Sequence, residues 1–152
     1  MGQMVSRWVV AEEVPVDDAD VDGDGVARAA FRDELVDRAV RAYLALCEAF
    51  TEQSRRQFAD PQVTLAGRPG TLRMGDAPSV ALVASAVEVL TTSFVIAVRL
   101  RPLGGASPDD DEPVDARCVV RLLDPGSGMP LAIDRTVRDE LIALEQAARH
   151  IG

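Results

Sequence analysis

The sequence predicts an α+β fold in which an antiparallel sheet covers one long helix. Three observations lead to this prediction: one long amphipathic helical pattern, a run of strand-like segments with no helix between them, and a short helical pattern at the end. Consecutive strands without intervening helices favour antiparallel pairing. The 152 residues and the hydrophobic content of 47% suit a single domain over residues 1–152 with its own core.

The first half of the chain is expected to form an edge strand and the long helix. Val and Trp residues favour a strand over residues 7–16, and Pro15, which has no backbone N–H, favours an edge position. An acidic turn follows at 17–26. The helix is expected over 31–52, because apolar residues recur there every three or four positions. These residues are Leu35, Val36, Ala39, Val40, Tyr43, Leu46, Cys47 and Phe50.

The second half is expected to supply most of the sheet. Two short apolar pieces lie within 62–74, and strong strand patterns cover 80–90, 93–100 and 116–123. The link Thr91–Thr92 is short enough to indicate an antiparallel hairpin. The sheet is therefore expected to have about five strands, wrapped around the long helix.

Polar segments separate or cap these later elements. Residues 102–114 read as a loop, and its acidic run 109–112 is interpreted as solvated rather than as a metal site. Asp134 is expected to cap a short C-terminal helix that runs to about Ala148.

The composition excludes several classes of function. A net charge of −9 argues against nonspecific nucleic-acid binding, which needs basic residues to neutralise phosphates. All 16 basic residues are Arg, so Schiff-base chemistry and a P-loop lysine are excluded. The only His is His150, close to the end, which argues against a Ser-His-Asp triad.

Cysteine usage and hydropathy indicate a cytoplasmic protein. Cys47 and Cys118 lie far apart and form no CxxC motif, so they are expected to be buried free thiols. No uninterrupted apolar run is long enough to cross a membrane, and the N-terminus lacks the pattern of a signal peptide.

The acidic turn is where we expect the chemistry. It places several carboxylates shortly before the start of the long helix, whose first backbone N–H groups lack partners and carry partial positive charge. These carboxylates belong to Asp17, Asp18, Asp20, Asp22 and Asp24. A carboxylate beside such a site can act as a base or a nucleophile while the N–H groups polarise an electrophile. The structural alternative is that Asp22 only stabilises the turn and Gly25 only allows it.

A calcium loop is a second interpretation of the same turn. Asp18-x-Asp20-x-Asp22-Gly23 fits the opening of an EF-hand. The twelfth position, which needs a bidentate Glu, is Ala29, and the preceding segment reads as a strand instead of a helix. A specific metal site is therefore not expected.

Two segments resemble the hotdog-fold acyl-CoA thioesterases of the 4-hydroxybenzoyl-CoA thioesterase type. The run Asp20–Val26 resembles the family's Asp-x-Asp-x-x-Gly-hydrophobic segment, which also lies between the first strand and the long helix. The run Glu88–Phe94 looks like the hairpin between two long strands, with the Ser-Phe pair retained. Tyr43 and Cys47 fall where some relatives carry the same residue types, and the order of elements agrees over nearly the whole chain.

The resemblance implies a function as well as a fold. It implies a hotdog fold, a homo-oligomer (dimer or tetramer) with its active site at the subunit interface, and an acyl-CoA substrate hydrolysed without a cofactor. Asp22 would be the catalytic carboxylate, as nucleophile or as general base. Gly25, Val26 and Ala29 would contact the substrate, with the helix N-terminus near Ala29 polarising the thioester carbonyl.

The chain also departs from the family pattern. Many relatives continue Gly-His-Val-Asn-Asn, where this chain has Gly25-Val26-Ala27-Arg28-Ala29. Thr91 and Thr92 replace basic residues that some relatives use for nucleotide phosphates, which leaves the CoA phosphate contacts unassigned. These departures keep a second hypothesis open: a hotdog-fold protein that binds acyl-CoA without turnover or has a structural role.

Overall fold

A computed structural model describes residues 8–47, 61–105 and 113–150 of the chain, with side chains described up to residue 147. Its elements in chain order are β1 (Val10–Pro15), a 3₁₀ helix (Asp18–Asp20), α1 (Ala29–Ala45), β2 (Gln62–Leu65), β3 (Ser79–Val89), β4 (Ser93–Leu103), β5 (Val114–Arg121) and α2 (Arg135–His150).

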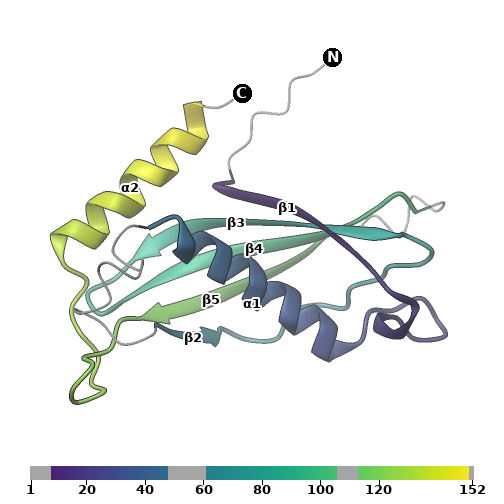
Figure 1. The fold of residues 1–152 in the computed structure, drawn as a ribbon, viewed down its shortest axis with the longest axis horizontal. Coiled ribbons are helices and arrows are strands. Elements are labelled where there is room, and N and C mark those ends of the chain that lie inside the picture. Colours follow the sequence, from purple (N-terminus) through teal and green to yellow (C-terminus); the bar gives the residue numbers. More distant parts are fainter. Residues whose placement is uncertain (1–7, 48–60, 106–112, 151–152) are drawn as a thin grey trace.

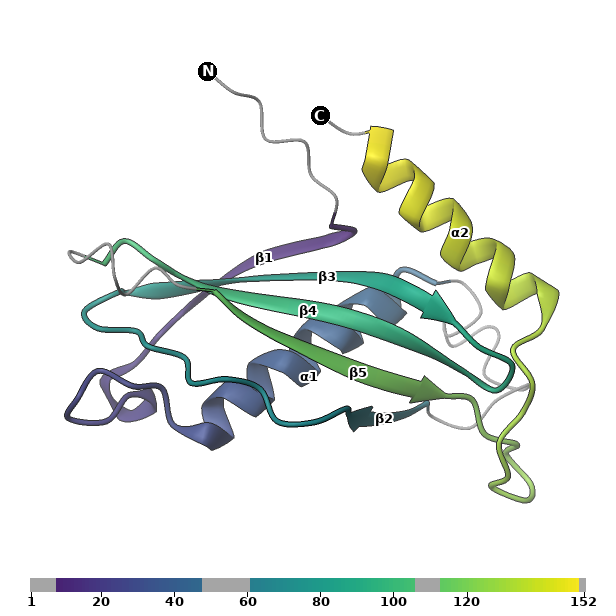
Figure 2. The same cartoon turned by 180° about the vertical axis from the view of Figure 1, so that it is seen from behind.

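The five strands form one antiparallel sheet in the order β1-β3-β4-β5-β2. The sheet curves around α1, which lies diagonally across one face, while α2 projects beside the end of β3 (Figures 1 and 2). The predicted α+β architecture is therefore confirmed, and its arrangement is that of a hotdog fold.

The core lies between α1 and the concave face of the sheet. Most of the predicted apolar stripe is buried, with Leu35, Val36, Ala39, Val40 and Tyr43 at most 2% exposed. The prediction is wrong for Leu46, which follows the last helical residue and is 50% exposed. Alternate residues of the central strands face this stripe. Among them are Val80, Leu82, Ala84, Ile96, Val98, Leu100, Cys118 and Val120, each at most 1% exposed.

The predicted edge strand is confirmed in position and is shorter than expected within the described residues. β1 pairs only with β3, from Val10↔Ala84 to Pro15↔Ser79, so Pro15 ends the pairing at a sheet edge. Arg38 of α1 donates to Glu12 of β1 through Nε (2.8 Å) and Nη2 (3.0 Å). This bidentate pair holds the edge strand against the helix.

The long helix ends earlier than predicted. α1 has 17 residues and stops at Ala45, where Leu46 N–H donates to the Tyr43 carbonyl and Cys47 N–H to the Leu44 carbonyl. These i→i−3 bonds tighten the last turn into a 3₁₀-like end. Phe50 and Glu52, at the predicted end of the helix, lie outside the described residues.

The remaining predicted elements are confirmed with small shifts of their ends. β3 and β4 form the expected antiparallel hairpin across Thr91–Thr92. Asp134 caps α2 as expected, because Val137 N–H donates to its Oδ1 at 2.9 Å. The acidic run 109–112 lies outside the described residues.

Both cysteines are buried free thiols, as predicted. Burial is the main reason that the pKa of Cys47 rises to about 12 and that of Cys118 to about 11. Neither thiol is therefore activated for nucleophilic chemistry. In the described part of the chain, no helix is both long and apolar enough to span a membrane.

We expect truncation of a core side chain to lower the free energy of unfolding much more than truncation of an exposed one. Leu82 is fully buried under α1 and Leu90 is 45% exposed. Leu82→Ala should lower the free energy of unfolding by about 2–5 kcal/mol, because it removes buried methyl groups and leaves a cavity. Leu90→Ala should cost under about 1 kcal/mol. Urea denaturation at one protein concentration measures both, and equal losses would contradict this description of the core.

Candidate active site

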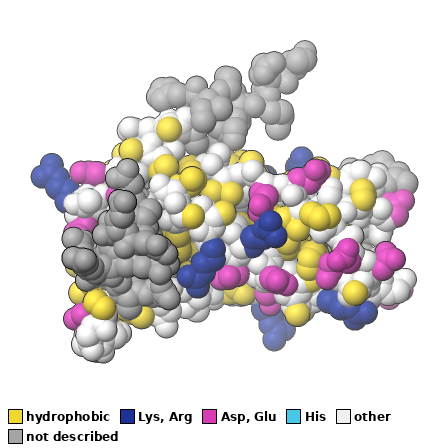
Figure 3. All heavy atoms as spheres, in the orientation of Figure 1, with side chains coloured by type: hydrophobic (Ala, Val, Ile, Leu, Met, Phe, Trp, Pro, Cys, Tyr) yellow, Lys and Arg dark blue, Asp and Glu magenta, His cyan; other side chains and the backbone are white. Residues whose placement is uncertain are grey.

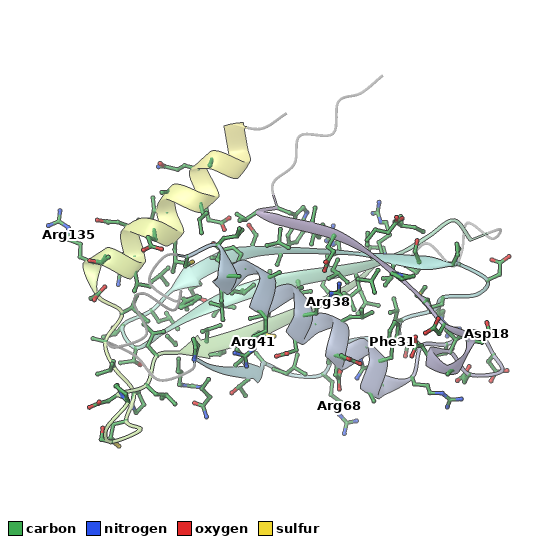
Figure 4. The ribbon with its side chains drawn as sticks, in the orientation of Figure 1. Asp18, Phe31, Arg38, Arg41, Arg68 and Arg135 are labelled. Carbon is green, nitrogen blue, oxygen red and sulfur yellow. The ribbon has the colours of Figure 1, made fainter. Side chains whose placement is uncertain are left out.

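The acidic turn is a small hairpin that leads directly into α1. Val21 and Ala27 form an isolated antiparallel bridge. Inside it, Asp22 N–H donates to the Val26 carbonyl (2.9 Å) and Gly25 N–H donates to the Asp22 carbonyl (3.1 Å). Figure 4 shows Asp18, on this turn, and Phe31, in the first turn of α1, at the same end of the molecule. Asp22 and the helix N-terminus thus belong to one compact unit.

The Asp22 carboxylate is exposed and accepts hydrogen bonds from its own turn. Its Oδ1 accepts from the N–H groups of Asp24 (2.9 Å) and Val26 (3.0 Å). The bonds from Val26 and then Asp24 lower the pKa of Asp22, with a smaller contribution from the charge of Arg28. Neither bond uses Oδ2. The group is therefore held in one orientation and stays ionised near neutral pH.

The backbone N–H groups from Asp24 to Arg28 all donate hydrogen bonds to acceptors in the hairpin or its neighbours. Ala27 donates to the Leu72 carbonyl (2.9 Å), Arg28 donates to the Asp20 carbonyl (2.9 Å), and the N–H groups of Asp24, Gly25 and Val26 bond within the hairpin. The first helical bond runs from Arg32 N–H to the Arg28 carbonyl (3.0 Å).

The N–H groups between the last hairpin donor, Arg28, and the first helical donor, Arg32, belong to the tip of α1. They come from Ala29, Ala30 and Phe31, the positions that an α-helix leaves without intrahelical acceptors. Arg28, the N-cap residue, provides no side-chain cap, and Ala29 and Ala30 are exposed. The electropositive end of α1 therefore begins at Ala29, whereas the N–H groups of Gly25 and Val26 already have partners.

Gly25 is required by the packing of the hairpin. Its φ is +79°, and a Cβ at this position would lie 3.0 Å from the Cα of Gly75. Its carbonyl accepts from the N–H groups of Met74 (2.8 Å) and Gly75 (2.9 Å), and Val26 bridges to Arg73. The structure thus gives Gly25 a definite conformational role beside its predicted substrate contact.

The neighbouring carboxylates of the turn accept hydrogen bonds from the backbone or face solvent. Asp20 Oδ2 accepts from Asp17 N–H at 3.1 Å, and Arg28 Nε donates to the Ala19 carbonyl at 3.0 Å. Within the residues that the structure describes, no three His, Cys, Asp or Glu side chains come together as a possible metal site.

Arg side chains lie close to the first turn of α1. The Arg32 side chain, 17% exposed, donates through Nη1 to the carbonyls of Gly70 (3.3 Å) and Pro69 (3.5 Å). This ties the loop after β2 to the helix tip. The same loop carries Arg68, which lines a cavity of about 180 Å³ together with Arg117 of β5. Figure 3 shows other Arg and acidic side chains intermixed over the α1 face.

Neither described cavity contains the predicted site residues. The cavity at Arg68 and a second one of about 280 Å³ between β3 and α2 are both lined by other residues than Asp22, Gly25, Val26 and Ala29. Asp22 itself is exposed in the single chain.

A second polar cluster was not anticipated from the sequence. The Glu145 carboxylate of α2 accepts hydrogen bonds from Tyr43 of α1 and from Ser85 and Ala86 of β3. Tyr43 and Glu145 are separated by 102 positions, and no motif connects them. The predicted burial of Tyr43 in the core is confirmed.

We expect Gly25 and Gly23 to respond differently to the same substitution. Gly25→Ala should destabilise the fold by roughly 1–3 kcal/mol, because it forces a positive φ on Ala and a contact with Gly75. Gly23→Ala is the matched control, since its added Cβ meets nothing within 4 Å. Thermal or urea denaturation of the two variants tests this, and equal stability would contradict the close approach of Gly25 to Gly75.

Comparisons with known proteins identify the fold. A scan of protein-family models finds no match, and a search of curated proteins finds no relative. Solved structures do match along most of the chain. A hypothetical protein from Staphylococcus aureus, in complex with CoA, has a TM-score of 0.68 at 9% identity, covering 96% of this chain and 89% of that one.

Two further matches are described as thioesterases. One, from Thermus thermophilus and complexed with coenzyme A and Zn, has a TM-score of 0.60 at 18% identity and covers 91% of this chain and 96% of that one. The other, a 1,4-dihydroxy-2-naphthoyl-CoA thioesterase from Synechocystis, has a TM-score of 0.61 at 14% identity and covers 89% and 96%. The chain therefore has the hotdog fold of the thioesterase structures that it matches.

Proposed function

We propose that the protein hydrolyses the thioester of an acyl-CoA, with Asp22 as the catalytic carboxylate. The observation that carries the proposal is the position of an oriented, ionised Asp22 on the hairpin that runs directly into the N-terminus of α1. Similar structures described as thioesterases, two of them complexed with or named for CoA compounds, support the substrate class.

The tip of α1 is the proposed site for the thioester carbonyl. Its N–H groups at Ala29, Ala30 and Phe31 precede the first helical hydrogen bond and coincide with the positive end of the helix dipole. In a site from which water is excluded, such donors stabilise the negative oxygen of a tetrahedral intermediate. The N–H groups of Gly25 and Val26 already donate hydrogen bonds within the turn. These two residues would therefore contact the acyl group through the Val26 side chain and the Cα of Gly25.

Two roles for Asp22 are consistent with this arrangement. As a base, Asp22 accepts a proton from water, the hydroxide attacks the carbonyl carbon, and collapse of the intermediate breaks the C–S bond to release the acid and the CoA thiol. As a nucleophile, Oδ2 attacks the carbonyl carbon and CoA leaves as the thiolate, which takes a proton from water. A water molecule then hydrolyses the mixed anhydride, which releases the acid and restores the Asp22 carboxylate. Both routes consume one water for each thioester.

A second subunit is proposed to enclose the site. Asp22, Ala29 and Ala30 are exposed in the single chain, and a thioester carbonyl gains little from N–H donors that face bulk water. β2 has a single neighbour, β5, so its other edge can pair with the same strand of a second copy and continue the sheet. A homodimer, or a tetramer built from such dimers, places one subunit against the hairpin of the other.

One observation supports the alternative of a protein that binds acyl-CoA without turnover. Oδ1 of Asp22 already accepts two hydrogen bonds that stabilise its own turn, so the residue has a structural reason to be present. In this alternative the fold and the binding surface remain, and hydrolysis is absent.

Asp22→Asn distinguishes the two. We expect this variant to keep its fold, because an amide oxygen can still accept from Asp24 and Val26, and to lose roughly 10²–10³-fold in kcat/KM, because the amide is neither base nor nucleophile. Asp24→Asn is the matched control on the same turn and should retain activity. Release of free thiol from short, long and aromatic acyl-CoAs is the measurement. Wild-type protein that binds these compounds and releases no thiol would instead favour the binding protein.

The pH profile of the hydrolysis tests the state of Asp22. Because hydrogen bonds from the turn lower its pKa below the ordinary 3.8, the active anion persists as the pH falls. We expect kcat/KM to show no loss from protonation of a carboxylate between pH 8 and about pH 5. An acidic limb centred near pH 6, absent from Asp22→Asn, would contradict the lowered pKa.

A further inference from the structure

The carboxylate of Glu145 joins three elements at the opposite end of α1 from the proposed active site. Its Oε2 accepts from Tyr43 Oη (2.6 Å) and from Ala86 N–H (2.9 Å), and its Oε1 accepts from Ser85 Oγ. Tyr43 is fully buried and Ser85 is 6% exposed. One side chain of α2 thus satisfies donors from α1 and from two consecutive residues of β3.

Ala86 lies where the pairing between β1 and β3 has ended. Among the described residues, the last pair is Val10 and Ala84, and Val9 N–H donates to the Ala84 carbonyl at 3.0 Å. Backbone groups two residues apart on a strand point to the same edge, so the N–H of Ala86 points to the edge that β1 occupies further along. Glu145 Oε2 therefore accepts the hydrogen bond that the carbonyl of a neighbouring strand would accept.

α2 starts beyond the end of β3 and passes it obliquely (Figures 1 and 2). Val137 and Leu141 of α2 are each 1% exposed. A cavity of about 280 Å³ remains between the helix and residues 86–89 of β3. At the outer surface of this region Val87 is 49% exposed and Ile142 is 46% exposed.

Without α2, this edge has the properties that promote pairing with another chain. The segment Val83–Leu90 reads Val-Ala-Ser-Ala-Val-Glu-Val-Leu, with high β-propensity, no Pro and a single charge. A sheet edge with free N–H groups and apolar side chains is a template for a strand from a second molecule. Most natural sheets cover or charge such an edge.

We propose that α2 is the cap of the β3 edge, anchored by Glu145, and that it prevents the β3 of a second copy from pairing there. The molecule that α2 keeps from this edge is a second copy of the chain, because the same segment of two copies can pair in antiparallel register. The part of β3 that extends beyond its pairing with β1 is then closed to addition, whereas β2 keeps an edge that no described strand covers. Association through both edges would have no closed end state and would continue to larger assemblies.

The first experiment compares Glu145→Ala with Gln146→Ala in the full chain. Gln146 is the neighbouring exposed residue of α2 and lines the same cavity without taking part in the cluster. In Glu145→Ala the Ala86 amide should exchange its hydrogen about tenfold faster or more, because its acceptor is lost. Light scattering after size exclusion should show assemblies larger than wild type that grow with protein concentration. Gln146→Ala should match wild type in both measurements.

A second variant separates edge pairing from simple loss of stability. Adding Val87→Lys to Glu145→Ala places a charge on the uncovered edge, which opposes strand addition and restores no bond to Ala86. The double variant should return to the wild-type mass while Ala86 still exchanges fast. The proposal is overturned if Glu145→Ala keeps the wild-type mass at every concentration, or if Val87→Lys leaves the larger species in place.

If Glu145→Ala does not fold, Glu145→Gln tests the same proposal. The amide has one acceptor oxygen, with two lone pairs, for three donors, so at least one of Tyr43, Ser85 and Ala86 loses its acceptor. The same two changes are expected at smaller size. Wild-type exchange at Ala86 together with wild-type mass in a folded Glu145→Gln variant would also overturn the proposal.

Discussion

The burial of α1 in the concave face of the sheet is the constraint on which the rest of the structure depends. The stripe from Leu35 to Tyr43 is almost completely removed from solvent, and each large aliphatic side chain buried in this way contributes roughly 1.5–3 kcal/mol. A flat sheet could cover only part of a stripe this wide. The strands β3, β4 and β5 therefore twist and curve around the helix. Ala39, 0% exposed in the middle of the stripe, lets the central strands approach the helix axis closely.

The same constraint determines where the proposed chemistry can occur. Because α1 is fixed in the sheet, its N-terminus is fixed as well, and the hairpin before it is held by backbone bonds from Ala27 to Leu72 and from Met74 and Gly75 to Gly25. Arg32 ties the loop at 69–70 to the first helical turn. Asp22 therefore does not sit on a free loop. Its orientation is set by a framework whose rigidity comes from the core.

The sequence correctly predicted those structural features that depend on interactions between residues close together in the chain. The stripe of α1, the hairpin of β3 and β4, and the cap at Asp134 all follow from spacing and residue type within a few positions. The end of α1 at Ala45 was missed, because Leu46 and Cys47 continue the apolar pattern past the last helical residue. The pairing of Gly25 with Gly75 and the cluster at Glu145 were also missed. Both join residues far apart in sequence, and a Glu in an amphipathic helix ordinarily reads as a surface charge.

The two carboxylates at opposite ends of α1, Asp22 and Glu145, differ in burial and in hydrogen bonding. Glu145 receives three donors on its two oxygens, from three different backbone or side-chain groups, and lies between packed elements. Three of its acceptor positions are occupied, and the side chain is partly buried where α2 meets α1 and β3. Asp22 is exposed, both hydrogen bonds from its turn end on Oδ1, and the bonding lowers its pKa. Both of these bonds leave Oδ2 out, and under the proposed function this is the oxygen that faces the thioester or the attacking water. Under the proposed function, this physical difference places the chemistry at the hairpin end of α1 and a structural role for Glu145 at the other end.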